Sequence, residues 1–375
     1  MVKDTKNDSA PNEPPRATSS DKGATAQSKE VPWHHLPDGR FRNPKGSPDR
    51  GGRRLRDALP FFADMFRRSF EKIAVPASHL VERAQAIKDL ASARDTKLAH
   101  ITWLGHASFL FQQGGYTVLT DPYLTTYAGP AGLGPKRFVK SGIPIRDLPP
   151  IDVLVVSHNH YDHLDERALA KLSGKDTMLV IVPLKLGSFF TERGFTNVIE
   201  LDWYEHHDLP AKPSDPSDPS GEGLRVTALP VVHWSRRVGF DTNTTLWAGF
   251  GFKSADHNLF FGGDSGYGEV FSEIGKTYGP FDTALIGIGA YDPRPMMYAS
   301  HATPEEAVQI GQDIRARRLV GMHWGTVVLT SEPPFEPPER FLAAGAAQGL
   351  DPENLWIMKI GETRPLNGTW PSNSI

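Results

Sequence analysis

Four side chains that bind divalent metal ions occur within six consecutive positions of this chain, directly after an apolar run. Residues 153–156 are apolar, as a buried strand requires, and Ser157 then ends the run. The four side chains are His158, His160, Asp162 and His163. Metal-binding and catalytic loops commonly leave the end of a rigid strand. Imidazoles and a carboxylate crowded into a partly dry pocket are costly unless a cation links them, so this loop predicts a metal site.

Three further side chains of the same types follow other short apolar runs. They are His233, Asp264 and His323. The two glycines before Asp264 allow the backbone to turn tightly and bring its carboxylate close to an ion. Because each group stands at the end of a strand-like run, we expect all of them to meet at one edge of a sheet sandwich.

Composition restricts the chemistry of such a site. The chain has no Cys, which excludes disulfides, thiolate zinc sites and cysteine nucleophiles, so His, Asp or Glu must bind any metal. The formal net charge of -3 gives no bias toward nucleic acid, and we expect no nucleic-acid partner. No run of about 18 apolar residues occurs, and residues 1–30 lack the apolar region of a secretory signal. The expected location is cytoplasmic or peripheral at the inner face of a membrane.

The chain divides into three predicted parts. Residues 1–56 are rich in Pro, Ser, Lys and Arg and poor in aliphatic residues, which predicts a disordered or extended arm. Residues 57–94 form an amphipathic helical segment, and residues 95–375 form the catalytic domain. Within 58–73, apolar residues recur at helical spacing beside basic ones. The apolar positions are Phe62, Met65, Phe66 and Phe70. Such a helix either packs on its own domain or lies on a membrane surface, and the residues leave both open.

Short β-like runs alternate with helical patterns from residue 101 onward. The runs are 108–111, 116–120, 153–156, 178–182, 224–228, 259–261 and 283–287. Helices are predicted over 165–172, 304–317 and 338–348. Because some strands alternate with helices while others follow one another through short turns, we predict an α/β fold of two mixed β-sheets flanked by helices.

The full set of residues resembles the metallo-β-lactamase superfamily. Its hallmark pattern, His-x-His-x-Asp-His, is present at residues 158–163, and His233, Asp264 and His323 follow in the expected order. A closer resemblance is to the branch that contains N-acylphosphatidylethanolamine phospholipase D and its bacterial relatives. The matching blocks are 102–108, 119–122, 134–137, 157–165, 198–203, 263–267, 289–291, 301–307 and 323–326. The N-terminal arm lies outside them.

This resemblance implies an αββα sandwich and two Zn²⁺ ions per chain, although the same ligands accept other divalent metals. By position, His158, His160 and His233 would bind the first ion. Asp162, His163 and His323 would bind the second, and Asp264 would bridge both.

The resemblance also implies a reaction: phospholipase D-type hydrolysis of N-acylphosphatidylethanolamine to N-acylethanolamine and phosphatidic acid. Paired divalent ions lower the pKa of water, so no Ser or Cys nucleophile is needed. The implied partners are a phospholipid substrate, a membrane surface at the periphery and a second copy of the chain in a homodimer. The implied catalytic residues are Asp162, Asp264 and His301.

Some roles stay open at this level. His301 is either a transition-state stabiliser or proton donor, or a neighbour of a helix N-terminus that bonds Glu305. Asp165, Asp121 and His106 are candidates to accept or share the second N–H of metal-bound imidazoles, although Asp121 reads equally well as a turn residue before Pro122.

Two other functions compete with the phospholipase reading. One keeps the dinuclear site but assigns a soluble phosphoester or lactone, because sugar-phosphate lactonases share the ligand loop. The other is a zinc-binding protein without catalysis, which the full set of ligand positions disfavours. Only the lipid reading predicts activity that rises with detergent-dispersed lipid and depends on Phe62 and Phe66.

Overall fold

The computed structural model describes residues 31–49, 61, 63, 64, 67, 68, 71–212 and 222–368. The chain divides into two compact units, Met1–Trp33 and His34–Ile375. All the sheets and helices below belong to the second unit.

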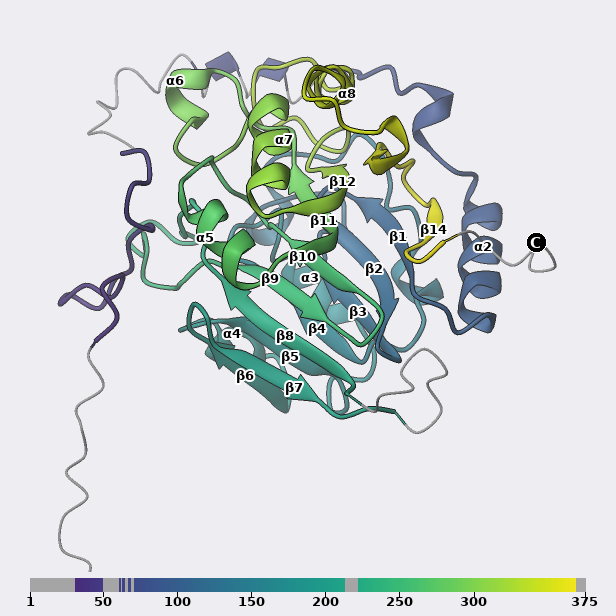
Figure 1. The fold of residues 1–375 in the computed structure, drawn as a ribbon, viewed down its shortest axis with the longest axis horizontal. Coiled ribbons are helices and arrows are strands. Elements are labelled where there is room, and N and C mark those ends of the chain that lie inside the picture. The colour runs from purple at the N-terminus through teal and green to yellow at the C-terminus, as the bar shows by residue number, and fades with distance from the viewer. Residues whose placement is uncertain are drawn as a thin grey trace, which may run out of the picture. The chain divides into compact units, whose positions relative to one another are not determined.

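Two seven-stranded mixed sheets form within the described residues, as predicted (Figure 1). The first contains β1 (His100–Gly105), β2 (Ser108–Gln113), β3 (Tyr116–Thr120), β4 (Val153–Val155), β5 (Leu179–Pro183), β6 (Asn197–Leu201) and β14 (Thr363–Pro365), in the order β14-β1-β2-β3-β4-β5-β6. The second contains β7 (His206–Leu209), β8 (Leu224–Leu229), β9 (Gly249–Lys253), β10 (Asn258–Phe261), β11 (Phe281–Gly287), β12 (Ala316–Met322) and β13 (Leu355–Trp356), in the order β13-β12-β11-β10-β9-β8-β7.

Each sheet is antiparallel on one side and parallel on the other. In the first sheet β14 to β3 pair antiparallel, and β3 to β6 pair parallel. In the second sheet β7 to β10 are antiparallel, and β10 to β13 are parallel. Since parallel neighbours present their carboxyl ends at one edge, the loops that follow β3 and β4, and those that follow β10, β11 and β12, gather there in each sheet.

The alternation of side chains along the strands explains why the sheets are covered on both faces. Phe109 and Phe111 of β2 belong to the larger core cluster, while Leu110 between them belongs to a second cluster on the opposite face. Successive side chains of a strand point to opposite faces, so both faces of this strand are buried. An apolar strand without polar alternation is typical of a sheet with a layer on each side.

Helices supply these outer layers. They are α2 (Arg83–Asp95), α3 (Glu166–Lys171), α4 (Gly187–Thr191), α5 (Val270–Thr277), α6 (Arg294–Met297), α7 (Pro304–Asp313) and α8 (Pro337–Ala347). Short 3₁₀ turns occur at η1 (Ala77–His79), η2 (Pro130–Gly132), η3 (Ile145–Asp147) and η4 (Pro352–Asn354). Helix α2 packs on β1 and β14, and α4 packs on β5 and β6. Helix α7 packs on β11 and β12, and α5 and α8 pack on α7 (Figure 1).

One predicted helix is too long. The pattern predicts a helix over 304–317, whereas α7 ends at Asp313 and β12 begins at Ala316. Arg315 between them has φ 60°, a left-handed conformation that ends the helix. The apolar residues that follow pair in parallel with β11 on one side and β13 on the other, so tertiary pairing overrides the helical pattern here.

Residues 34–49 of the predicted disordered or extended arm form no helix or regular strand, but they are packed on the domain. Phe41 is 2% exposed and belongs to the main core cluster. His34 and His35 both bond Asp202, and Asn43 accepts hydrogen bonds from His233 and Trp247. Burial of one aromatic ring and these polar contacts offset the cost of ordering the segment. Residues 1–30 and 50–56 lie outside the described residues.

The predicted amphipathic segment is described only in part. Phe62, Met65, Phe66 and Phe70 lie outside the described residues. Arg68 donates hydrogen bonds to the carbonyl oxygens of Thr330 and Ser331. Among the described residues, no helix is both long and apolar enough to span a membrane.

Candidate metal centre

The predicted metal-binding loop leaves the end of β4 and is fixed at both ends. The Ser157 backbone N–H donates to Asp121 Oδ1 at 2.7 Å. At the other end, Asp165 caps α3 by accepting from the backbone of Arg167 and Ala168. The loop between them therefore has rigid anchors in a central strand and a helix N-terminus.

The structure brings all seven predicted ligand side chains together. His158, His160, His233 and Asp264 offer ligand atoms that all lie within 4.8 Å of one another. A second such group contains His106, Asp162, His163 and His323. Asp264 lies between the two groups: its Oδ2 is 3.1 Å from His163 Nε2, and its Oδ1 is 3.2 Å from His323 Nε2.

The ionisation of these groups suits metal binding. Burial lowers the pKa of both His160 and His233 to about 3, so each imidazole is neutral and has a free lone pair at pH 7. Burial alone would raise the pKa of Asp264, but His163 and His323 hold it well below its usual range. Burial alone would lower the pKa of His163 and His323, but the Asp264 carboxylate raises the pKa of His163 well above its usual range and that of His323 to about 9. The site thus combines ionised carboxylates with two neutral imidazoles and two protonated ones, whose protons a metal ion would displace.

Several ligand atoms are buried without a hydrogen-bond partner. These atoms are His160 Nε2, His163 Nε2, His323 Nε2 and Asp264 Oδ1. Buried polar atoms are nearly always paired, and each unpaired one costs free energy. His and carboxylate groups that converge in this way fit divalent metal ions, and the site is one that binds divalent metal.

Outer contacts orient the imidazoles. His163 Nδ1 donates to Asp121 Oδ2 at 2.6 Å, and His233 Nδ1 donates to the Ser300 carbonyl at 2.9 Å. His106 Nε2 lies 2.9 Å from Asp162 Oδ2. Asp121 is fully buried and therefore does more than shape the turn before Pro122, whereas Asp165 serves α3 and bonds no imidazole of the centre.

His301 lies beside the two groups. Its Nδ1 is 3.9 Å from Asp264 Oδ2, and its ring centroid is 5.2 Å from that of His233. The alternative in which His301 bonds Glu305 is wrong. Thr303 and Glu306 form the capping box of α7, and Glu305 pairs with Arg340 on α8.

Two residues that contact the centre, Asn43 and Arg237, could not be predicted from any sequence pattern. Asn43 Oδ1 accepts the backbone N–H of His233 at 2.9 Å. Arg237 donates to the carbonyl oxygens of Asn159 and Leu164, at 3.1 and 2.9 Å, and lies over the Tyr161 ring. Both contacts join segments that are far apart in the chain, so only the fold reveals them.

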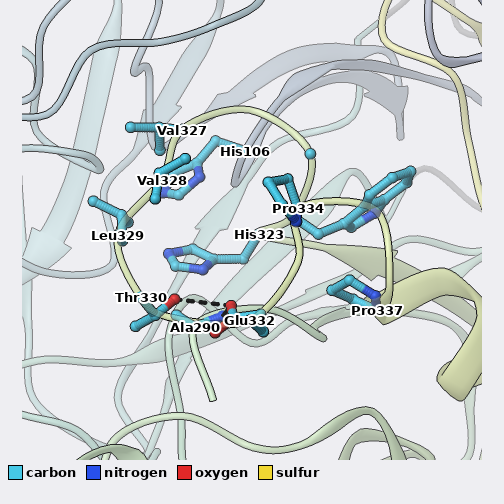
Figure 2. Close-up of a pocket in the computed structure, with 12 residues that line it drawn as sticks. His106, Ala290, His323, Val327, Val328, Leu329, Thr330, Glu332, Pro334 and Pro337 are labelled. Atoms are coloured by element: carbon cyan, nitrogen blue, oxygen red, sulfur yellow. Dashed lines mark hydrogen bonds between the residues drawn. The ribbon is translucent and has the colours of Figure 1, made fainter. Parts of the chain in front are cut away.

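A cleft with an apolar side opens next to the second group. Figure 2 shows the rings of His106 and His323 facing a loop that carries Val327, Val328 and Leu329. Pro334 and Pro337 lie on another side of the cleft, and Glu332 accepts a hydrogen bond from Thr330 at 2.8 Å. Half-buried aliphatic side chains therefore border the metal-binding groups directly.

Comparison with known proteins agrees with this fold and site. The profile of the beta-lactamase superfamily domain matches residues 116–324, more than half of the chain. The chain therefore belongs to the metallo-β-lactamase superfamily, and it is a metal-dependent hydrolase.

Relatives place it more narrowly, in the branch that resembles N-acylphosphatidylethanolamine phospholipase D. An uncharacterized protein of Mycobacterium tuberculosis is 35% identical over 75% of this chain and 73% of its own length. The N-acyl-phosphatidylethanolamine-hydrolyzing phospholipase D 1 of Caenorhabditis elegans is 36% identical over 64% of this chain and 67% of its own length. The mitochondrial enzyme of the same name from Saccharomyces cerevisiae is 38% identical over 70% of this chain but only 55% of its own length.

Solved structures share the fold at low identity. An isothiocyanate hydrolase from Delia radicum gut bacteria matches with a TM-score of 0.54 and 18% identity, over 70% of this chain and 98% of the other. The diiron β-hydroxylase CmlA of Streptomyces venezuelae matches with a TM-score of 0.51 and 20% identity, over 72% of this chain and 54% of the other. At these identities the likeness concerns the fold alone.

Proposed function

We propose that the protein is a dinuclear zinc phosphodiesterase that hydrolyses N-acylphosphatidylethanolamine, or a related glycerophospholipid, to N-acylethanolamine and phosphatidic acid. The observation that carries this proposal is the meeting of two His and Asp groups at Asp264, next to a cleft bordered by Val327, Val328 and Leu329. The names of the yeast and nematode relatives support the substrate class.

In this proposal His158, His160 and His233 would hold one ion, Asp162, His163 and His323 would hold the other, and Asp264 would be available to both. Divalent ions at such a site activate water and neutralise charge on phosphate oxygens. The outer contacts of Asp121 and His106 then hold the imidazole and carboxylate ligands in orientation.

His301 has a separate proposed role. Its ring is 16% exposed beside Asp264, while most ligand side chains around it are fully buried. A side chain at this place can donate a hydrogen bond to an oxygen on which negative charge develops, either on phosphorus or on the leaving alcohol.

The loop after His233 is the proposed contact with a lipid surface. Phe240 is 99% exposed and Val238 is 64% exposed, whereas large apolar side chains are normally covered. Arg236 lies over the ring of Trp234, which itself contacts the His160 ring at 4.5 Å. Apolar tips with a basic neighbour suit an anionic membrane interface, and this loop would carry the protein to its substrate.

The test is direct. Purified protein of known metal content is incubated with N-acylphosphatidylethanolamine in detergent micelles, and mass spectrometry measures N-acylethanolamine and phosphatidic acid. Asp264→Asn serves as the control, since it removes the shared carboxylate at nearly unchanged volume. Product from wild type alone is the expected result.

A metal content of about two zinc ions per chain without lipid cleavage would overturn the lipid assignment. The second candidate, a hydrolase of a soluble phosphoester or lactone, would then replace it, because it needs the same centre without the apolar cleft.

A further inference from the structure

A second cluster of metal-binding side chains shares no residue with the centre described above. It consists of His34, His35 and Asp202. The two histidines belong to the N-terminal segment 34–49, and Asp202 stands between β6 and β7, where the first sheet passes into the second. Neither the ligand loop nor the blocks shared with the phospholipase branch contain the two histidines.

One ligand atom from each of the three residues lies within 4.8 Å of the other two. His34 Nε2 lies 2.6 Å from Asp202 Oδ1, and His35 Nε2 lies 2.8 Å from Asp202 Oδ2. The imidazole planes are at 81° with centroids 4.6 Å apart. Adjacent side chains of an extended chain diverge, so the convergence of these two on one carboxylate is a specific feature of the turn.

Aromatic neighbours and backbone groups hold the cluster. The His34 ring stacks on Trp203 at 4.3 Å, and the His35 ring packs edge-on against Phe41 at 5.0 Å. The Trp203 backbone N–H donates to Asp202 Oδ1. The rotamers of all three ligand groups are therefore restricted before any ion arrives, which reduces the entropy lost on binding.

Charge and access also suit a cation. Glu205 lies next to the cluster and accepts the Asp202 backbone N–H, and within the described residues no Lys or Arg forms an ion pair with Asp202. The side chains of His34 and Asp202 are 6% and 12% exposed, whereas that of His35 is 27% exposed. One side of the cluster is thus open for water as a further ligand.

We propose that His34, His35 and Asp202 bind a divalent transition-metal ion outside the catalytic centre. Two imidazoles and one carboxylate are the ligand set of borderline ions such as Zn²⁺, Ni²⁺ and Co²⁺, and a poor set for Mg²⁺ or Ca²⁺, which prefer oxygen. The bound ion ties segment 34–49 to the sheets. This segment carries Asn43, whose side chain accepts the backbone N–H of His233.

The experiment compares metal binding by the full chain and two variants. His35→Gln keeps an N–H that can donate to Asp202 but removes a strong metal ligand. His206→Ala is the matched control, because His206 is 45% exposed on the neighbouring β7 and belongs to neither cluster. Equilibrium dialysis against Co²⁺ is expected to give about one ion per chain fewer for His35→Gln than for wild type, with His206→Ala unchanged.

A second readout follows the segment itself. Added Zn²⁺ is expected to slow proteolysis within residues 34–49 in wild type but not in His35→Gln. Equal ion counts in all three proteins, with equal protection of the segment, would overturn the proposal and leave a hydrogen-bonded clamp. Neither readout depends on lipid cleavage, so failure here is distinguishable from failure of the proposed function.

Discussion

At the scale of single residues, Asp121 is the most informative side chain outside the ligands. Its two carboxylate oxygens serve three donors: His163 Nδ1, the Ser157 backbone N–H and the Ser157 hydroxyl, at 2.6, 2.7 and 2.6 Å. Ser157 Oγ also lies 2.9 Å from His158 Nδ1. One buried carboxylate therefore orients imidazoles of both predicted ligand triads.

Asp121→Asn is expected to lower metal affinity or activity by roughly 10 to 100-fold. The neutral amide is a weaker acceptor for the His163 N–H than the carboxylate is. A competition assay with a chelating dye measures the affinity. Asp351→Ala is the control: it removes the side-chain cap of η4, belongs to neither ligand group, and is expected to cost about 1 kcal/mol of stability with little change in metal affinity. Equal metal affinity of Asp121→Asn and wild type would refute the orienting role.

His100 in β1 offers a pH prediction away from the centre. Burial lowers its pKa to about 4, against 6.5 in the unfolded chain. The unfolded state therefore gains a proton first as the pH falls, so stability is full above pH 6.5 and is lost between pH 6.5 and 4. The total loss is about 3 kcal/mol.

His100→Asn removes the titration while its amide can still donate to the Leu98 carbonyl. Urea unfolding at several pH values is expected to show a shallower fall in stability below pH 6.5 for the variant than for wild type. An equal fall in stability with pH in the wild type and in His100→Asn would show that His100 does not titrate as its burial predicts.

At the scale of elements, several strands that are buried on both faces were predictable, although β1, which is buried along its whole length, was not among the predicted runs. Residues 116–120 and 153–156 read as strands because their apolar residues serve a core on each side. Strands β6 and β7 escaped prediction because they lie at the ends of their sheets and are largely exposed, with polar residues such as Glu200 and Asp208. Strand β9 escaped because Gly249 and Gly251 weaken its pattern.

The candidate site was more predictable than the elements around it. The ligand types and their order identify the family at once, and each ligand follows an apolar run. Contacts such as that of Asn43 with His233 were not predictable, since a single Asn in a Pro-rich and basic segment has no pattern to distinguish it.

Asn43 connects the segment 34–49 to His233 and Trp247 by hydrogen bonds. Asn43→Ala leaves the His233 backbone N–H and the Trp247 indole N–H with one partner fewer, at an expected cost of about 1 to 3 kcal/mol. Thermal unfolding measures the stability, and metal titration tests whether the His233 ligand position loosens. Asn258→Ala is the control, since its side chain bonds the carbonyl oxygens of Tyr278 and Pro280 and not His233.

The exposed loop after His233 gives a prediction for catalysis at interfaces. Phe240→Ser is expected to lower binding to anionic vesicles and activity on vesicle-borne lipid severalfold, because an exposed apolar anchor is lost. Hydrolysis of a small soluble phosphodiester should be unchanged, since Phe240 is not one of the predicted metal ligands. Equal loss with both substrates would argue against a membrane role.

At the scale of the whole molecule, the centre joins the two sheets. The loop with His158 and His163 follows β4 of the first sheet, while Asp264 and His323 follow β10 and β12 of the second. Metal that binds the folded state alone stabilises it, by about 4 kcal/mol when free metal is 1,000-fold above the dissociation constant.

Chelation is therefore expected to lower the melting temperature of the wild-type protein, and added Zn²⁺ to restore it. Differential scanning calorimetry with and without chelator measures both effects. Asp264→Asn should respond less, because it lacks the carboxylate that contacts both groups. An equal melting temperature of the wild-type protein with and without chelator would show that the ions do not stabilise the folded sheets.

The order of the ligands along the chain also determines when the centre can form. The ligand loop at 158–163 is synthesised before His323, which follows β12. A nascent chain on the ribosome therefore exposes the loop at 158–163 without its partners from the second sheet. The complete ligand set therefore requires both sheets to be folded, so the metal supply during folding influences which ion is bound.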